Sequence, residues 1–147
     1  MTSSASEGAL AVREKVVIAT GKRKTSIARA VITPGEGRVW VNNTPLEVYP
    51  IEMAREKIAE PLKLVGNLAS KVDIRISVRG GGVMSQAEAC RIAIARGIVE
   101  FFSEIRDELK KLIKEYDRYA LSGDPRRTEP EKWGRISARR RWQKSYR

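Results

Sequence analysis

The chain has 147 residues, of which 41% are hydrophobic and 6% aromatic, so it suits one domain with short extensions. It has no histidine, the commonest general base, and its single cysteine, Cys90, excludes an internal disulfide and a cysteine-based zinc site. The net charge is +11; residues 132–147 hold seven Lys or Arg and no acid, which leaves 11 − 7 = +4 for residues 1–131. A cationic segment beside a moderately charged body predicts a polyanionic partner, with nucleic acid as the first candidate.

Three short runs in the first third of the chain are typical of strands. They are rich in β-branched residues, are separated by turn residues, and cover residues 16–20, 27–33 and 38–42. We predict an antiparallel meander from them. The first strand is expected to end at Gly21, so that residues 22–25 form a basic turn.

A fourth strand and a first helix are predicted in the middle of the chain. Residues 71–79 alternate strictly between apolar and polar, which predicts a half-buried strand with a charged outer side. Before it, apolar residues recur at helical spacing after Pro50. Pro61 interrupts this pattern and Gly66 ends it.

A longer helical pattern follows. It begins with Ser85 and Glu88, which have the spacing of a capping box, and runs to about Leu121. It predicts one long helix, or two helices broken near Ser103. Cys90 lies on the apolar stripe of this pattern, which favours a place in the core over a reactive thiol.

Strands grouped ahead of helices predict an α+β fold, in which helices cover one face of an antiparallel-rich, four-stranded sheet. The charged outer side of that sheet can then meet a large, flat surface. We expect a flexible lead in residues 1–14, a globular domain in 15–121 and an extended basic arm in 122–147. The lead lacks the apolar segment of a secretory signal, and no apolar run approaches the roughly 18 residues of a membrane span, so the expected location is the cytoplasm.

The basic turn does not match a nucleotide-binding phosphate loop. That pattern needs a glycine five residues before its Gly-Lys pair and a Ser or Thr directly after it, and Val16 and Arg23 occupy those positions. Two interpretations stay open. The turn is either a solvated hairpin connection or a device by which Lys22, Arg23 and Lys24 contact a phosphate backbone.

A triple glycine, Gly80, Gly81 and Gly82, separates the fourth strand from the long helix. Ser85 replaces the third glycine of a dinucleotide-binding fingerprint, and no acid-bearing strand follows, so that function is not indicated. The glycines form either a flexible connection or a place where the backbone approaches another surface closely.

The C-terminal segment interleaves Trp133, Trp142 and Tyr146 with its cations. Aromatic side chains stack on bases, and arginine pairs with phosphates through a planar fork, so this pattern favours RNA. The arginine cluster at 139–141 also occurs in localisation signals, which leaves targeting or solubilisation as the alternative.

These motifs resemble those of the S-nine family of small-subunit ribosomal proteins (the universal uS-nine family) in its archaeal or eukaryotic form. The most specific stretch joins the triple glycine to Gln86 and to the small residues of the following helix. Residues 21–30 resemble the opening hairpin of the family, and residues 124–127 and 143–147 resemble its C-terminal arm. The likeness covers about residues 14–147. One departure is that Gly134-Arg135-Ile136 follows Trp133, where archaeal members often have paired glycines.

The resemblance implies an α+β domain like domain two of ribosomal protein S-five, seated on 16S-type rRNA in the subunit head beside neighbouring ribosomal proteins. It also implies an arm that reaches the peptidyl site and touches the tRNA there. The residues expected to contact rRNA are Lys22, Arg23, Lys24, Arg79, Gly80, Gly81, Gly82, Arg126, Arg127, Lys132, Arg135, Arg139, Arg140 and Arg141. Those expected to contact tRNA are Lys144, Ser145, Tyr146 and Arg147. No catalytic residue, metal or cofactor is implied.

The alternatives are another RNA-binding protein, an RNA-modifying enzyme and a DNA-binding module. An enzyme needs a catalytic constellation, and the sequence contains none that we recognise. A DNA reader needs a helix with base-reading residues, whereas the long helix carries a core stripe. We therefore predict a structural rRNA-binding protein whose arm folds on binding.

Overall fold

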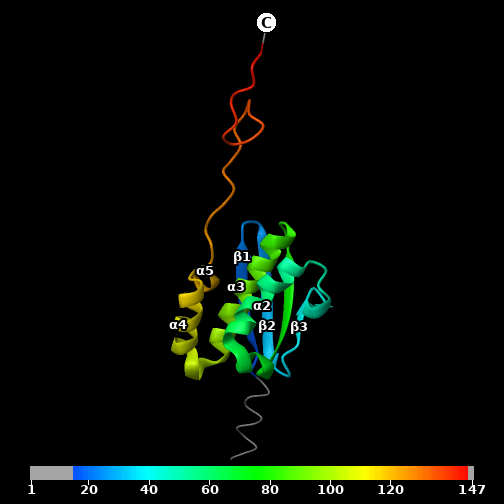
Figure 1. Ribbon diagram of the computed structural model, residues 1–147, viewed down its shortest axis with the longest axis vertical. Coiled ribbons are helices and arrows are strands. Elements are labelled where there is room, and N and C mark those ends of the chain that lie inside the picture. Colours follow the sequence, from blue (N-terminus) through cyan, green and yellow to red (C-terminus); the bar gives the residue numbers. More distant parts are fainter. Residues whose placement is uncertain (1–14, 146–147) are drawn as a thin grey trace, which may run out of the picture.

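A computed structural model describes residues 15–145 of the chain (Figure 1). The strands are β1 (Val17–Arg23), β2 (Ser26–Pro34), β3 (Val39–Val41), β4 (Thr44–Pro45) and β5 (Val72–Arg79). The helices are α2 (Glu52–Val65), α3 (Val83–Phe101), α4 (Arg106–Tyr116) and α5 (Tyr119–Ser122), and the 3-10 helices are η1 (Leu46–Val48), η2 (Gly66–Lys71) and η3 (Ser103–Ile105). The α+β class is confirmed, but the sheet has five strands in the order β1-β2-β5-β3-β4 rather than four. The added strand, β4, is only two residues long and has no periodicity to detect.

The position of β3 differs from the predicted meander. β1 and β2 form the expected antiparallel hairpin, but β5 pairs with β2, and β3 pairs in parallel with the far side of β5. The carboxylate of Asp73 holds the connecting loop across the end of β5, because it accepts the N–H groups of Glu36 at 2.9 Å and Arg38 at 3.0 Å. The side-chain amide of Asn42 then binds the backbone of Val78 in both directions, at 3.0 and 2.9 Å. These contacts, between residues far apart in the sequence, place β3 beside β5 and not beside β2.

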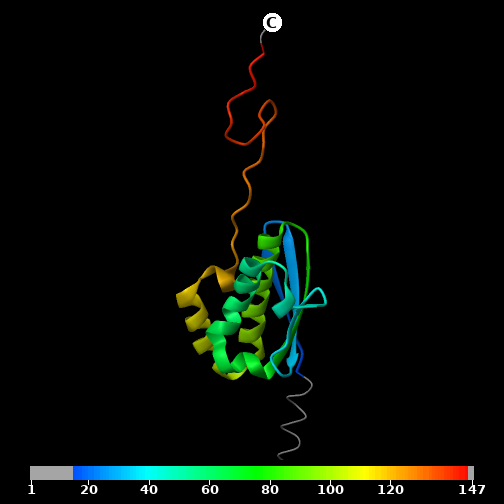
Figure 2. The same cartoon turned by 45° about the vertical axis from the view of Figure 1, so that its right-hand side comes forward.

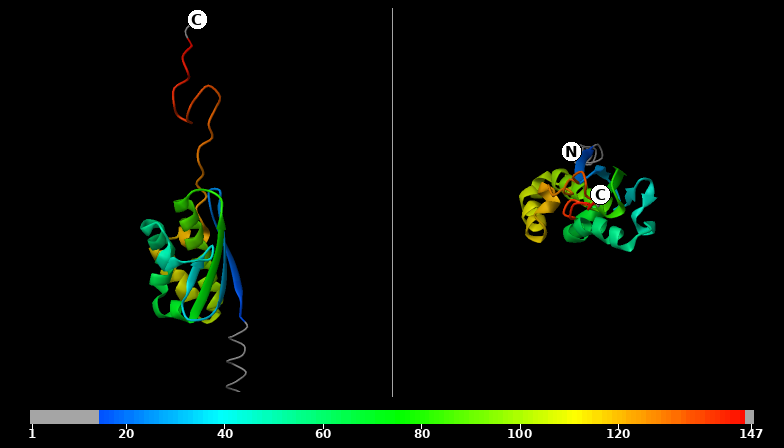
Figure 3. Two further views of the ribbon diagram at one scale, coloured as in Figure 1. Left: turned by 90° about the vertical axis from the view of Figure 1, so that its right-hand side faces the viewer. Right: turned by 90° about the horizontal axis from the view of Figure 1, so that it is seen from above.

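The helices lie on one face of the sheet, as predicted, and leave the other face open (Figures 2 and 3). Helix α3 lies along the middle of this layer, and its apolar stripe, Cys90 included, is fully buried. The helical pattern breaks at η3, close to the predicted point near Ser103. The predicted capping box is wrong, because α3 already begins at Val83, with Gly82 as its N-cap, and Ser85 lies inside the first turn.

Helix α3 approaches β1 very closely. A Cβ atom on Gly21 would lie 2.1 Å from the carbonyl oxygen of Ala89 and 2.7 Å from the backbone nitrogen of Ala93. A side chain at position 21 would therefore push the helix away from the sheet. Gly21 on the hairpin and the small residues Ala89 and Ala93 on the helix together allow this close contact.

Beyond α5 the described chain, residues 123–145, contains no helix or strand, and Figure 1 shows it leaving the end of the body. Helix α5 ends at Ser122, and the next residue, Gly123, has a φ of +83°. The division of the chain at residues 14 and 121 stays a prediction. Among the helices within residues 15–145, none is long and apolar enough to cross a lipid bilayer.

Candidate nucleic-acid interface

Strand β1 is longer than predicted, and this changes the basic turn. Lys22 and Arg23 continue β1 and pair with β2, so only Lys24 and Thr25 form the turn. Lys24 has φ +52°, as tight two-residue hairpin turns require, and its side chain is exposed. Since side chains alternate along a strand, Lys22 faces the open side of the sheet and Arg23 faces the helices.

Arg23 binds other parts of the chain. Its guanidinium pairs with the carboxylate of Glu88 on α3 and lies 3.3 Å from that of Asp124 at the start of the arm. It also donates to the carbonyl oxygen of Arg126 at 3.0 Å. With a side chain only 12% exposed, Arg23 is an internal anchor in this conformation.

The glycine turn packs against the basic turn. Gly80 and Gly81 have φ values of +81° and +66°. A Cβ on Gly80 would lie 2.6 Å from the carbonyl oxygen of Thr25, and one on Gly81 would lie 2.2 Å from the hydroxyl oxygen of Ser26. The fully buried Ser26 donates that hydroxyl to the Gly80 carbonyl at 2.9 Å. Gly80 and Gly81 therefore allow the backbone to approach the protein's own hairpin closely. Gly82 has no such neighbour.

The root of the arm is fixed at the same end of the body. Arg96 of α3 donates to the carbonyl oxygens of Leu121 at 2.7 Å and Thr20 at 2.9 Å. Arg126 donates to the Asp124 carboxylate at 2.6 Å, and this hydrogen bond holds the pKa of Asp124 well below its usual value. The basic turn, the glycine turn and the arm root, which are far apart in the sequence, thus meet at one end of the molecule (Figure 1).

The arm contains a closed loop. The rings of Trp133 and Trp142 lie 4.9 Å apart between centroids, and the guanidinium of Arg135 lies 4.3 Å from the Trp142 ring. The N–H of Gln143 donates to the carbonyl oxygen of Gly134 at 2.9 Å, and Gly134 has φ +72°. We name residues 133–143 the tryptophan loop. It is a local structure within the arm, and folding of the arm on binding stays a prediction.

The other predicted arm residues have exposed side chains. Arg139 donates to Glu129 at 2.9 Å. The exposed set is Arg126, Arg127, Lys132, Arg139, Arg140, Arg141, Lys144 and Ser145. Tyr146 and Arg147 lie outside the described residues, and their role in tRNA binding stays a prediction.

Arg79 ends β5 on the open side of the sheet, where the structure places two further arginines that our predicted set omits. Arg75 lies on the same strand, and Arg29 lies on β2 between the buried Ala28 and Ala30. The alternation of residues 27–33 is the signal that could have found Arg29. Within residues 15–145 no group of three or more acidic, Cys or His side chains is arranged to hold a metal ion.

The model of the ribosomal protein S9/S16 family matches residues 21–147. The chain belongs to this family. The small ribosomal subunit protein uS9 of Desulfurococcus amylolyticus is 70% identical over 133 residues, which cover 90% of this chain and 94% of the relative. The uS9 proteins of Aeropyrum pernix and Pyrobaculum aerophilum are 61% and 59% identical, over 91% and 90% of this chain and 98% and 92% of their own lengths.

Membership of the S9/S16 family confirms the resemblance that the triple glycine, the hairpin and the arm indicated. It identifies the chain as a ribosomal protein with a structural role and not an enzyme. The match includes both the hairpin and the arm, so the features that meet at one end of the body all fall within the family's span.

Proposed function

We propose that this protein is a structural constituent of the small ribosomal subunit, which binds 16S-type rRNA in the subunit head and extends its arm to the peptidyl-site tRNA. The subunit follows from the relatives, all three of which are named as small-subunit proteins. The observation that carries the proposal is the arm, which leaves the body from a braced root and presents exposed cations along its length.

Affinity for rRNA is divided between body and arm. On the body, Lys22, Lys24 and Arg79 have exposed cationic side chains near the glycine turn. On the arm, the three consecutive exposed arginines at 139–141 lie within the tryptophan loop and act as one cluster. If all seven cations of residues 132–147 meet phosphates, they contribute a log-log salt slope on the order of −5 to −6 to rRNA binding.

The tip has a different role in this proposal. The described part of the arm ends at Ser145, far from the body (Figure 1), so the tip is expected to reach a partner that the body does not touch. Lys144 and Arg147 carry the charge that pairs with tRNA phosphates, and Tyr146 supplies a ring that stacks or donates a hydrogen bond.

The test removes residues 144–147 and measures two properties of reconstituted small subunits. We expect the shortened protein to enter the subunit as the full chain does, and the subunits to bind peptidyl-site tRNA more weakly. The matched control replaces Lys111 and Lys114, two exposed cations of α4, with serine, which removes the same charge from another surface. Unchanged tRNA affinity in the shortened form would refute the role of the tip.

The choice of RNA over DNA is tested separately. Filter binding compares a small-subunit rRNA transcript with duplex DNA of equal charge over a range of salt concentrations. We expect tighter binding to the transcript throughout. Equal affinity for both at every salt concentration would count against the ribosomal function.

A further inference from the structure

The face of the sheet that the helices leave open carries ordered rows of side chains. The register of the strands defines these rows, and neighbouring strands lie about 4.8 Å apart. From one end to the other, the rows are Ile18, Val31, Arg75 and Trp40; then Thr20, Arg29 and Ser77; then Lys22, Ile27 and Arg79. Cations from three strands thus share one surface, which we name the open face.

The open face is positively charged in the part of the chain that the structure describes. Four of its side chains are exposed cations that form no ion pair with any residue of 15–145: Lys22, Arg29, Arg75 and Arg79. The described strands contain one acid, Asp73. Burial opposes its ionisation, but N–H bonds from Arg38 and Glu36 outweigh this and hold the pKa of Asp73 below its usual value. Its charge is therefore directed at the loop.

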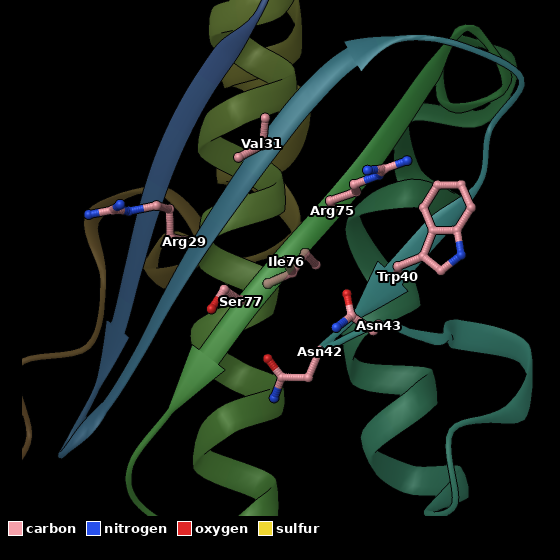
Figure 4. Close-up of a pocket in the computed structure, with 8 residues that line it drawn as sticks. All are labelled: Arg29, Val31, Trp40, Asn42, Asn43, Arg75, Ile76 and Ser77. Atoms are coloured by element: carbon pink, nitrogen blue, oxygen red, sulfur yellow. The ribbon is translucent and has the colours of Figure 1, made fainter.

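A shallow hollow of about 590 Å³ is lined by two of these cations, Arg29 and Arg75 (Figure 4). Figure 4 shows Arg29 extending from β2 across β1, whereas Arg75 turns towards Trp40, so Val31 and Ser77 form an uncovered floor between them. The Arg75 guanidinium lies 5.4 Å from the centroid of the Trp40 ring, a cation–π contact that orients it. The hollow therefore combines two separated guanidinium groups, one aromatic ring and a small floor.

From this arrangement we propose that the open face is a second RNA-binding surface, which holds a single-stranded segment of rRNA across the strands. Arg29 and Arg75 pair with its phosphates, and Trp40 with Arg75 forms a platform for a base or ribose. The inference rests on the proposed function for its choice of rRNA. It adds a site formed by Arg29, Arg75 and Trp40, in the rows of the open face that lie beyond Lys22 and Arg79.

The chemistry of the face favours RNA over an acidic protein segment. Paired arginine and tryptophan side chains offer flat surfaces for stacking as well as charge, and an unpaired base can use both. An acidic peptide would use only the charge. The amide side chain of Asn43, exposed at the rim of the hollow, adds a donor and an acceptor suited to a base edge.

The first test replaces both arginines with glutamine, which removes the charge and keeps part of the aliphatic side chain. Arg29→Gln with Arg75→Gln is compared with Lys111→Gln with Lys114→Gln on α4, in the full chain, by filter binding to a small-subunit rRNA transcript. We expect the first pair to lower the magnitude of the log-log salt slope by about 1.4 to 1.8, as the loss of two phosphate contacts requires. We expect the control pair to leave the slope unchanged, and circular dichroism to show both variants folded.

Equal slopes for the two variants would overturn the inference while leaving the proposed function standing, because the wild-type protein would still bind the transcript. A wild-type protein that does not bind the transcript at all would refute the proposed function and the open face together. The two failures are thus distinct.

A second test locates the contact directly. Cys90 is fully buried, so an Fe-EDTA probe can be attached selectively to Ser77→Cys on the open face or to Lys114→Cys on α4. In reconstituted subunits we expect the probe at position 77 to cleave rRNA at a few adjacent nucleotides, more strongly than the probe at position 114. Cleavage of rRNA from position 77 that is no stronger than cleavage from position 114 would contradict the proposal.

Discussion

The guanidinium of Arg23 lies 3.3 Å from the carboxylate of Asp124, which joins the end of the first strand to the beginning of the arm. These side chains are only 12% and 8% exposed, so water screens the pair weakly. Because Arg23 also pairs with Glu88 on α3, one side chain links the sheet, the central helix and the arm. The direction in which the arm leaves the body is therefore set by a shielded charge cluster.

Replacing Arg23 with glutamine is expected to loosen the arm root without unfolding the body. The change leaves Glu88 and Asp124 with one cation fewer and costs about 1 to 3 kcal/mol. Backbone amides near Arg126 should exchange faster with deuterated solvent than in the wild type. Arg127→Gln removes the same charge from an exposed position and is the control. Equal exchange in both variants would contradict the anchoring role of Arg23.

The triple glycine provides an internally controlled prediction. Gly81→Ala should destabilise the protein by about 2 to 4 kcal/mol, because left-handed backbone strain adds to the collision with Ser26. Gly82→Ala should cost less than about 1 kcal/mol, since its φ is −97° and no heavy atom lies within 4 Å of the added Cβ. Urea unfolding measures both, and similar losses would show that the turn does not pack as described.

The tryptophan loop should exist in the unbound protein. The ring of Trp142 should shift the side-chain proton resonances of Arg135 upfield in NMR spectra, because the guanidinium lies 4.3 Å from its centroid. Trp142→Ala should return these resonances to their ordinary positions, whereas Ile136→Ala, at an exposed position of the same loop, should not. Ordinary Arg135 resonances in the wild type would show that the loop forms only with a partner.

Cys90 should be unreactive in the folded protein. Its burial raises the pKa of the thiol to about 12, so almost no thiolate is present at pH 8. A thiol reagent should label the chain rapidly in denaturant and very slowly without it. Rapid labelling of the native state would contradict the place of Cys90 in the core.

The same pKa shift predicts a loss of stability at alkaline pH. Above its ordinary pKa of 9.0 the thiol ionises in the unfolded state but not in the folded state, so the contribution is intact below pH 9 and declines towards pH 12. Between pH 8 and pH 10 the wild type should lose about 1 kcal/mol more than Cys90→Ala. Equal losses in urea unfolding would show that Cys90 ionises equally in both states.

Local patterns predicted most of the elements. The alternation of residues 71–79 corresponds to β5, and the helical spacing that follows corresponds to α3 and α4, with the break close to Ser103. They failed at β3, because the choice between two neighbouring strands depends on Asp73 and Asn42, whose partners lie far away in the sequence. They also failed at the start of α3, where Gly82 caps the helix in place of Ser85.

The sequence by itself determined that this is a basic α+β protein with a cationic arm, and its motifs were specific enough to indicate the family. Charge, periodicity and spacing are local properties that can be read without a fold. Only the tertiary structure decided that Arg23 braces the arm and that Arg29, Arg75 and Trp40 share one face. Such groupings depend on which strands pair and which side chains meet across the core, and these contacts form between residues that no local pattern connects.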